Sequence, residues 1–100
     1  MSEMKKLDEI KSIIASHMEI LKSRYKVKEI GVFGSYVRGT PGKKSDIDVI
    51  VTFRKSVDFI EFLKLEAYLS DLLGLQVDLV TKNALKPFIG RQILEEVVYV

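Results

Sequence analysis

Three aspartates are the residues of this chain best suited to chemistry. Asp46 and Asp48 form a D-I-D pair, and Asp78 lies in the stretch V-D-L-V-T. Because side chains alternate across a strand, the first two carboxylates point from the same face and can share cations. Asp78 sits among apolar residues, where an unneeded charge is costly. We therefore expect the three acids to form one site, and since clustered carboxylates repel each other, that site requires bound Mg²⁺.

A second chemical signal precedes the aspartates. Gly34 and Ser35 follow the stretch V-K-E-I-G-V-F and begin a short helical turn that ends before Gly39. The free backbone N–H groups and the positive dipole end of such a turn suit a phosphate. Arg38, one turn after Ser35, can reach the same phosphates and neutralise a pyrophosphate leaving group. The loop residues Lys43 and Lys44 are candidate auxiliary cations, although most such lysines are only solvated loop charges.

A phosphate cradle beside paired carboxylates predicts metal-assisted nucleotidyl transfer. In this hypothesis Asp46 and Asp48 bridge two Mg²⁺ ions, one of which carries the triphosphate of a nucleotide. The second ion, shared with Asp78, lowers the pKa of an acceptor hydroxyl that attacks the α-phosphorus in line, and Asp78 can also take the proton. Alone, a Gly-Ser pair is most often a turn and a D-x-D pair a solvent-facing edge. The combination and its spacing indicate a site.

Hydrophobic patterning predicts three strands that position these residues. Residues 27–33, 46–53 and 75–81 show the alternation and β-branched composition of strands. In the second of them, four apolar residues lie on the face opposite the aspartates and are expected in the core: Ile47, Val49, Val51 and Phe53.

Two long helices are expected to cover that apolar face. Residues 5–24 carry an apolar stripe at three- and four-residue spacing, which predicts one helix. A second helix is expected to begin after Asp58, which with Glu61 resembles a capping box, and to end at Gly74.

The remaining segments complete an alternating order of elements. Residues 84–96 are mostly helical in pattern, and the tail V-V-Y-V is expected to close as a short strand. The order α-β-α-β-α-β-α predicts one α/β (α+β) domain over residues 1–100, a small mixed sheet with helices packed on one face.

Length and composition exclude several classes of protein. One hundred residues, 47% of them hydrophobic, make one globular domain without a second substrate-binding module, so a large acceptor must come from outside. No apolar run approaches the roughly 20 residues that cross a bilayer, and no signal-peptide core is present, so a cytoplasmic location is expected. The absence of cysteine excludes disulfides and thiolate metal sites. A net charge of +2 is too small to indicate nucleic-acid binding.

These motifs resemble the signature of the minimal nucleotidyltransferases of the DNA polymerase β superfamily. The segment G-S-Y-V-R-G followed by D-I-D matches their active-site pattern, V-D-L-V-T resembles their third-carboxylate strand, and K-P-F-I-G-R-Q-I-L-E-E-V-V-Y-V is similar to their usual C-terminus. The resemblance covers nearly the entire chain. It maps the metal carboxylates of the family onto Asp46, Asp48 and Asp78, and its phosphate-binding pair onto Gly34 and Ser35.

The resemblance also implies a fold, a substrate and a partner. It implies the nucleotidyltransferase fold, the use of Mg²⁺ and ATP, and frequently a partner with a HEPN domain, which is a helical RNase-like toxin. In such pairs the minimal nucleotidyltransferase is the antitoxin and transfers AMP from ATP onto a tyrosine of the toxin. This reading, a Mg²⁺-dependent protein adenylyltransferase, is the first functional hypothesis.

Two further functions stay open. The chain can be a binding antitoxin that covers its partner without catalysis, through an exposed aspartate face flanked by Ile50 and Val80. It can also be a nucleotidyltransferase acting on RNA ends or on a small hydroxylated molecule, although the lack of a second domain and of a strongly basic face counts against this. An incompletely covered sheet also favours homo- or hetero-oligomers.

Overall fold

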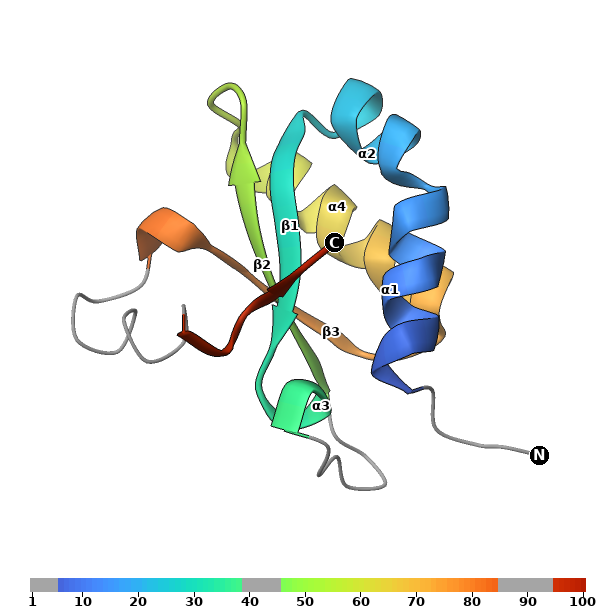
Figure 1. Cartoon of the computed structure of the whole chain (residues 1–100). Coiled ribbons are helices and arrows are strands. Elements are labelled where there is room, and N and C mark those ends of the chain that lie inside the picture. Colours follow the sequence, from blue (N-terminus) through green and yellow to red (C-terminus); the bar gives the residue numbers. More distant parts are fainter. Residues whose placement is uncertain (1–5, 39–45, 85–94) are drawn as a thin grey trace.

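The computed structural model describes residues 6–38, 46–84 and 95–100, and it has the expected alternating α/β architecture (Figure 1). The predicted loop with Lys43 and Lys44, and most of the helical pattern in residues 84–96, lie outside the described residues. The elements in chain order are α1 (Leu7–Ser16), α2 (Met18–Arg24), β1 (Val27–Phe33), α3 (Ser35–Arg38), β2 (Ile47–Phe53), α4 (Phe59–Leu73), β3 (Val77–Thr81), the 3-10 helix η1 (Lys82–Ala84) and β4 (Val98–Tyr99).

The described strands form a mixed four-stranded sheet in the order β3-β2-β1-β4. β1 pairs antiparallel with both β2 and β4, whereas β2 and β3 run parallel. Parallel neighbours need a crossover, and α4 supplies it, so β2, α4 and β3 form a βαβ unit. The predicted tail strand is confirmed, because Tyr99 pairs with Gly31 and Val98 with Val32.

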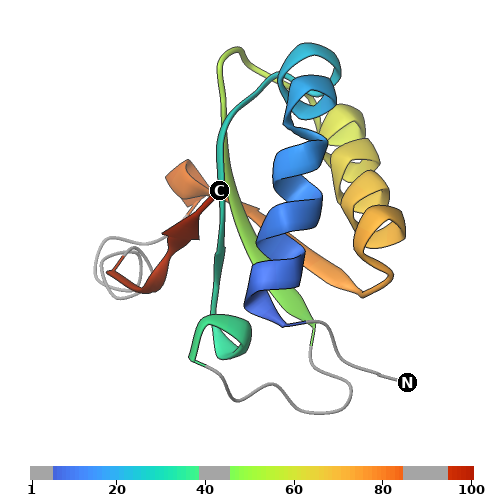
Figure 2. The same ribbon diagram turned by 45° about the vertical axis from the view of Figure 1, so that its right-hand side comes forward.

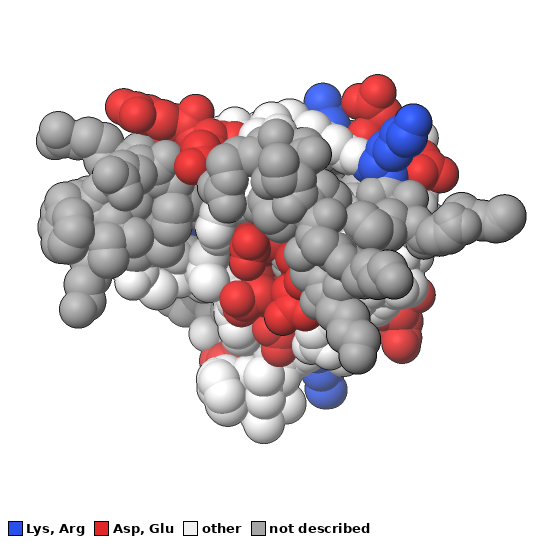
Figure 3. Space-filling view, turned by 90° about the horizontal axis from the view of Figure 1, so that it is seen from below, with Lys and Arg blue, Asp and Glu red and all other residues white. Residues whose placement is uncertain are grey.

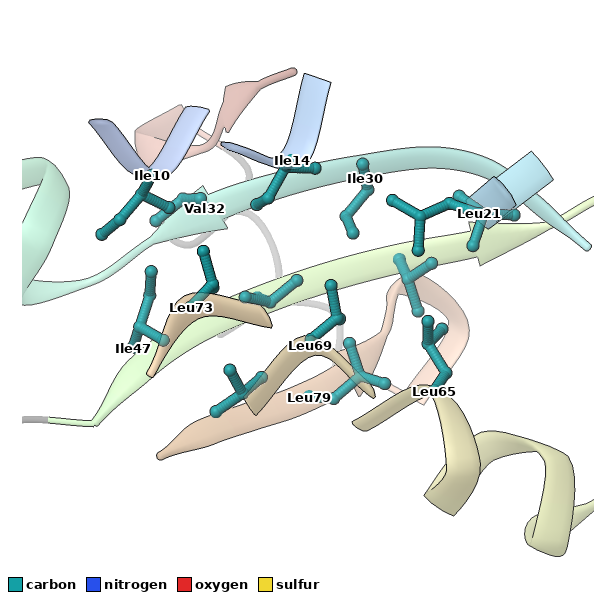
Figure 4. Packing of buried hydrophobic residues seen from close by; sticks show 14 of the residues in the cluster. Ile10, Ile14, Leu21, Ile30, Val32, Ile47, Leu65, Leu69, Leu73 and Leu79 are labelled. Carbon is teal, nitrogen blue, oxygen red and sulfur yellow. The ribbon is translucent and has the colours of Figure 1, made fainter. Parts of the chain in front are cut away.

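The helices α1, α2 and α4 pack on one face of the sheet, as predicted (Figure 2). The core lies between this helical layer and the sheet, and Figure 4 shows apolar side chains meeting there from both layers. Ile47, Val49 and Val51 are buried as expected, while Phe53 is only partly buried and packs against the core from its margin. The labelled core residues are Ile10, Ile14, Leu21, Ile30, Val32, Ile47, Leu65, Leu69, Leu73 and Leu79.

The first helix differs from the prediction, since residues 7–24 form two helices that meet at His17. The side-chain Nδ1 of His17 donates to the carbonyl of Ile13 at 2.9 Å, and the backbone N–H of His17 bonds instead to Ile14 at 3.0 Å. A side chain that enters the backbone ladder in this way breaks a helix. The apolar stripe survives the break, because Ile14 before it and Leu21 after it are both fully buried.

Both predicted ends of α4 are confirmed. Asp58 Oδ1 accepts the N–H of Glu61 at 2.7 Å, and Glu61 Oε1 accepts the N–H of Asp58 at 3.0 Å, which completes the capping box. Gly74 closes the helix with φ 69°, a left-handed conformation that favours glycine. Glu61 Oε2 also lies 2.8 Å from Lys26 Nζ, so one carboxylate caps α4 and ties it to the start of β1.

The ionisation of the Glu61 carboxylate should contribute to the pH dependence of the stability. The hydrogen bond from Lys26, followed by that from the Asp58 backbone, lowers the pKa of Glu61 below its usual value of 4.5. A lowered folded-state pKa gives stability that is present above the unfolded pKa and lost as the pH falls through the folded one. In melting curves between about pH 6 and about pH 3, we expect Glu61→Gln to lose less stability on acidification than the native protein. Glu19→Gln, at an exposed site of α2, should keep the native slope.

The outer edge of the sheet, at β3, is covered by side chains of α4. The N–H of Val77 donates to Ser70 Oγ and the N–H of Leu79 donates to Glu66 Oε2, both at 3.2 Å. These donors point away from β2, toward the open side of β3 on which an added strand would otherwise pair. Polar caps of this kind protect an edge strand from strand-to-strand association.

Removing one edge cap should lower stability measurably. Ser70→Ala leaves the part-buried N–H of Val77 without its acceptor, so we expect the free energy of unfolding to fall by about 1 kcal/mol. Urea unfolding monitored by circular dichroism measures this change. Ser12→Ala on the exposed side of α1 is the matched control and should change stability by much less. Equal effects of the two substitutions would show that the cap contributes nothing.

Candidate active site

The strand register brings the predicted aspartates to one end of the sheet. Asp48 on β2 is the direct parallel partner of Asp78 on β3, and Asp46 lies two positions before Asp48. The intervening pair, Ile47 and Val77, is buried in the core, so the aspartates belong to the face away from the helices. Seen from below, the end of the molecule where β2 and β3 begin carries a group of acidic side chains at its centre (Figure 3).

These carboxylates are neighbours, but their oxygen atoms are not yet arranged to coordinate a common metal ion. Asp46 and Asp78 are exposed and Asp48 is half-buried. Within residues 6–38, 46–84 and 95–100, no three acidic or histidine side chains form a group that could hold a metal ion as they stand. Repulsion between like charges favours such separation, and a divalent cation reverses it. The donor set itself, carboxylate oxygens from adjacent strands, is the kind that Mg²⁺ binds.

Gly34 brings the backbone of the β1–α3 turn against the carboxylate of Asp48. The residue before it, Phe33, pairs with Asp48 across the sheet, and Gly34 itself has φ +84°. A Cβ at this position would overlap Asp48 Oδ2 and come within 3.2 Å of Asp48 Cγ. Glycine is therefore required here for two reasons, its backbone angle and the space that the carboxylate occupies. The sequence pattern predicted an open approach for phosphate at Gly34, and the structure adds this contact with Asp48.

The short helix α3 starts where the sequence places its phosphate-binding turn. Ser35 opens the helix and Arg38 closes it, and the N–H of Val37 donates to the carbonyl of Gly34 at 3.0 Å. Tyr36 is 5% exposed and belongs to the hydrophobic core, so its ring fixes α3 against the sheet. Tyr36 was not among the predicted site residues, although an aromatic side chain inside G-S-Y-V-R-G is a usable signal for such an anchor.

One expectation about the aspartate face is wrong. Ile50 was expected to flank the acids as an exposed apolar residue, but it is only 1% exposed. Val80, its direct partner on β3, is half-buried. Strand alternation assigns a residue to a face, yet it does not show whether that part of the face is covered. These two residues therefore do not offer the apolar interface that the sequence suggested.

Comparison with known proteins identifies the family. The family described as nucleotidyltransferase domain matches residues 14–100, which is most of the chain. The chain belongs to this family. The match includes both ends of the candidate site, from the Gly34 turn to Asp78, and so the acids and the turn belong to a nucleotidyltransferase.

Related proteins agree with this assignment. The nucleotidyltransferase is 51% identical over 94 residues to a Thermococcus cleftensis protein named protein adenylyltransferase MntA, and the match covers 94% of this chain and 95% of that one. A solved structure provisionally described as a minimal nucleotidyltransferase superposes with a TM-score of 0.81 at 28% identity, covering 97% of this chain and 98% of the other. The predicted fold class is thereby confirmed.

A solved complex is also similar. A crystal structure described as a toxin–antitoxin with AMP-PNP matches with a TM-score of 0.70 at 28% identity, covering 85% of this chain and 69% of that chain.

Among the described residues, no helix of this nucleotidyltransferase has the length and apolar composition needed to cross a membrane.

Proposed function

We propose that this nucleotidyltransferase transfers AMP from ATP to the hydroxyl group of a tyrosine in a partner HEPN-domain toxin. We further propose that it acts as the antitoxin of that pair. One observation carries the proposal. Asp48 lies directly beside Asp78 and against the Gly34 turn, so that a carboxylate pair suited to Mg²⁺ and a turn suited to phosphate share one end of the sheet. The name of the relative, protein adenylyltransferase, and the AMP-PNP in a similar toxin–antitoxin complex support the chosen substrate and partner.

The reaction assigns a separate task to each residue. Asp46, Asp48 and Asp78 would hold two Mg²⁺ ions, which when bound neutralise the triphosphate and acidify the acceptor hydroxyl. The backbone of Gly34 and Ser35 holds the outer phosphates, and Arg38 balances the charge of the pyrophosphate as it leaves. The acceptor oxygen forms a bond to the α-phosphorus while the bond to the β-phosphate oxygen breaks. Asp78 accepts the proton that the hydroxyl loses.

A protein acceptor fits the tasks given to these residues. All of them act on the nucleotide, its metal ions or the proton that is lost, and none of them binds the body of an acceptor. A folded partner can supply that missing surface along with the reacting hydroxyl. The partner then becomes substrate and target together, which fits an antitoxin that works by modification.

Incubation with α-labelled ATP, Mg²⁺ and the HEPN-domain protein encoded by the adjacent gene tests the proposal. We expect label on the partner, and we expect it to disappear with Asp46→Asn or Asp78→Asn. If the native protein neutralises the toxin without labelling it, and the two substitutions leave neutralisation unchanged, the protein is a binding antitoxin and the enzymatic proposal fails. Mg²⁺ with ATP should also raise the melting temperature of the native protein, because a ligand that binds the folded state stabilises it.

A further inference from the structure

The first two turns of α4 carry an exposed apolar surface. Phe59, Ile60 and Leu63 are 70%, 59% and 40% exposed, and their spacing brings Leu63 beside both of the others. We call these three residues the α4 ridge. The opposite side of the same helix supplies Leu65, Leu69 and Leu73 to the core, so this helix is apolar on an outer side as well. Adjacent exposed large apolar side chains on a small domain mark an interaction site.

A cavity adjoins the ridge at the end of the sheet where β2 and β3 finish. It has a volume of about 450 Å³, and we call it the β2–α4 cavity. Phe59 of the ridge forms part of its wall, so the two surfaces are continuous. Thr52 of β2 is also in this lining. Other lining residues include Phe62, Thr81, Lys55 and Lys82. A cavity with apolar walls beside an exposed apolar ridge suits an inserted apolar side chain.

The charges around the cavity favour an acidic ligand. Lys55 and Lys82 are exposed in its lining, and neither makes an ion pair within the described parts of the chain. The nearby carboxylates are already engaged, since Asp58 caps α4 and Glu61 binds Lys26. The lining therefore carries two lysines against the one carboxylate of Asp58, which is a net positive charge. Complementary charge guides partner choice and association rate at protein interfaces.

We propose that the α4 ridge and the β2–α4 cavity together dock the acceptor protein, through an acidic segment that inserts one large apolar side chain into the cavity. This inference rests on the proposed function and adds the surface that binds the acceptor. Large apolar anchors in a pocket with a polar rim carry most of the binding energy at protein interfaces. The ridge, the cavity and the free lysines supply all three of these features.

The position of this surface leaves the reactive end free. Asp48 lies near the start of β2. The cavity is lined by Val51, Thr52 and Phe53, which lie at the end of that strand. A rise of about 3.3 Å per residue separates Asp48 from Phe53 by roughly 16 Å. Because the carboxylates lie on the face of the sheet away from α4, the acceptor needs more than about five extended residues between the anchor and the reacting tyrosine. Docking and chemistry use opposite ends of the same strand.

Kinetics with the HEPN-domain partner test the docking surface directly. We expect Phe59→Glu, and separately Lys82→Glu, to raise the KM for the partner protein at least tenfold. The rise in melting temperature caused by Mg²⁺ and ATP should stay native in both variants, since neither residue lies at the reactive end. Tyr99→Glu is the matched control, because it places the same charge on another exposed aromatic residue at the far edge of the sheet. Its KM should remain native.

Partner binding, measured by calorimetry without ATP, separates this inference from the proposed function. If the native protein binds the partner without labelling it, and Phe59→Glu abolishes that binding, the docking surface stands although the enzymatic proposal fails. Native binding and native KM in both variants would overturn the docking surface. It would also be overturned by a dimer in sedimentation that Phe59→Glu dissociates, or by cosedimentation with anionic vesicles that Phe59→Glu abolishes, since the ridge would then bind a second copy or a membrane.

Discussion

Asp48→Asn is expected to reduce AMP transfer to the partner by roughly 10²–10³-fold, the usual loss when one group that stabilises transition-state charge is removed. Asp48 is the central acid of the proposed site, because it pairs in register with Asp78 and its carboxylate lies against Gly34. An amide keeps the size of the side chain and removes its negative charge. Single-turnover measurement with saturating partner isolates the chemical step from docking.

Asp71→Asn provides the control for this substitution. Asp71 is an exposed aspartate on α4, outside the site, and its change from acid to amide is chemically the same. It should leave both the rate and the melting temperature near native values. Circular dichroism checks that the Asp48 variant is folded. A folded Asp48→Asn protein with native transfer rate would exclude Asp48 from the reaction.

Gly34→Ala is expected to have the second largest effect, on stability and on activity together. A left-handed backbone costs an alanine about 1 kcal/mol, and the added Cβ would in addition overlap the Asp48 carboxylate. The turn or the carboxylate must move, so we expect a loss of about 2–3 kcal/mol in unfolding free energy. Because the displaced group is the central acid, transfer should fall as well.

Gly74→Ala separates the two causes. Gly74 also has a positive φ, of 69°, but among the described residues, apart from its chain neighbours and its own helix, no atom lies within 4 Å of an added Cβ there. This substitution should therefore cost only the backbone term, about 1 kcal/mol, and leave transfer native. Denaturant unfolding and the labelling assay measure both variants side by side. If the two alanines cost the same stability and both proteins remain active, the contact between Gly34 and Asp48 has no role in the site.

Local patterns predicted much of the fold because the relevant signals are local. β1 and α3 have the predicted bounds, since Gly34 ends the strand and the next four residues form the turn. The capping box at Asp58 likewise fixed the start of α4. The break at His17 was not predicted, because it depends on a side-chain hydrogen bond to Ile13 that apolar spacing does not register.

The site was predictable to the extent that strand alternation determines it. Period-two spacing placed Asp46 and Asp48 together, and the parallel register then brought Asp78 beside Asp48. Strand alternation does not show whether other residues cover a given part of a sheet face. For that reason the expected exposure of Ile50 was wrong. The contact of Gly34 with Asp48 joins positions fourteen residues apart in the sequence and needed the three-dimensional pairing to be seen.

Paramagnetic broadening by Mn²⁺ tests the central claim most directly. Mn²⁺ prefers the same oxygen ligands as Mg²⁺, and in the presence of ATP it should occupy the site formed by the three acids. In amide spectra of the native protein, we predict the strongest broadening at Gly34, Asp46, Asp48 and Asp78, and its loss in Asp48→Asn. Broadening centred on any other part of the molecule, or no localised broadening with Mn²⁺ and ATP present, would contradict the account.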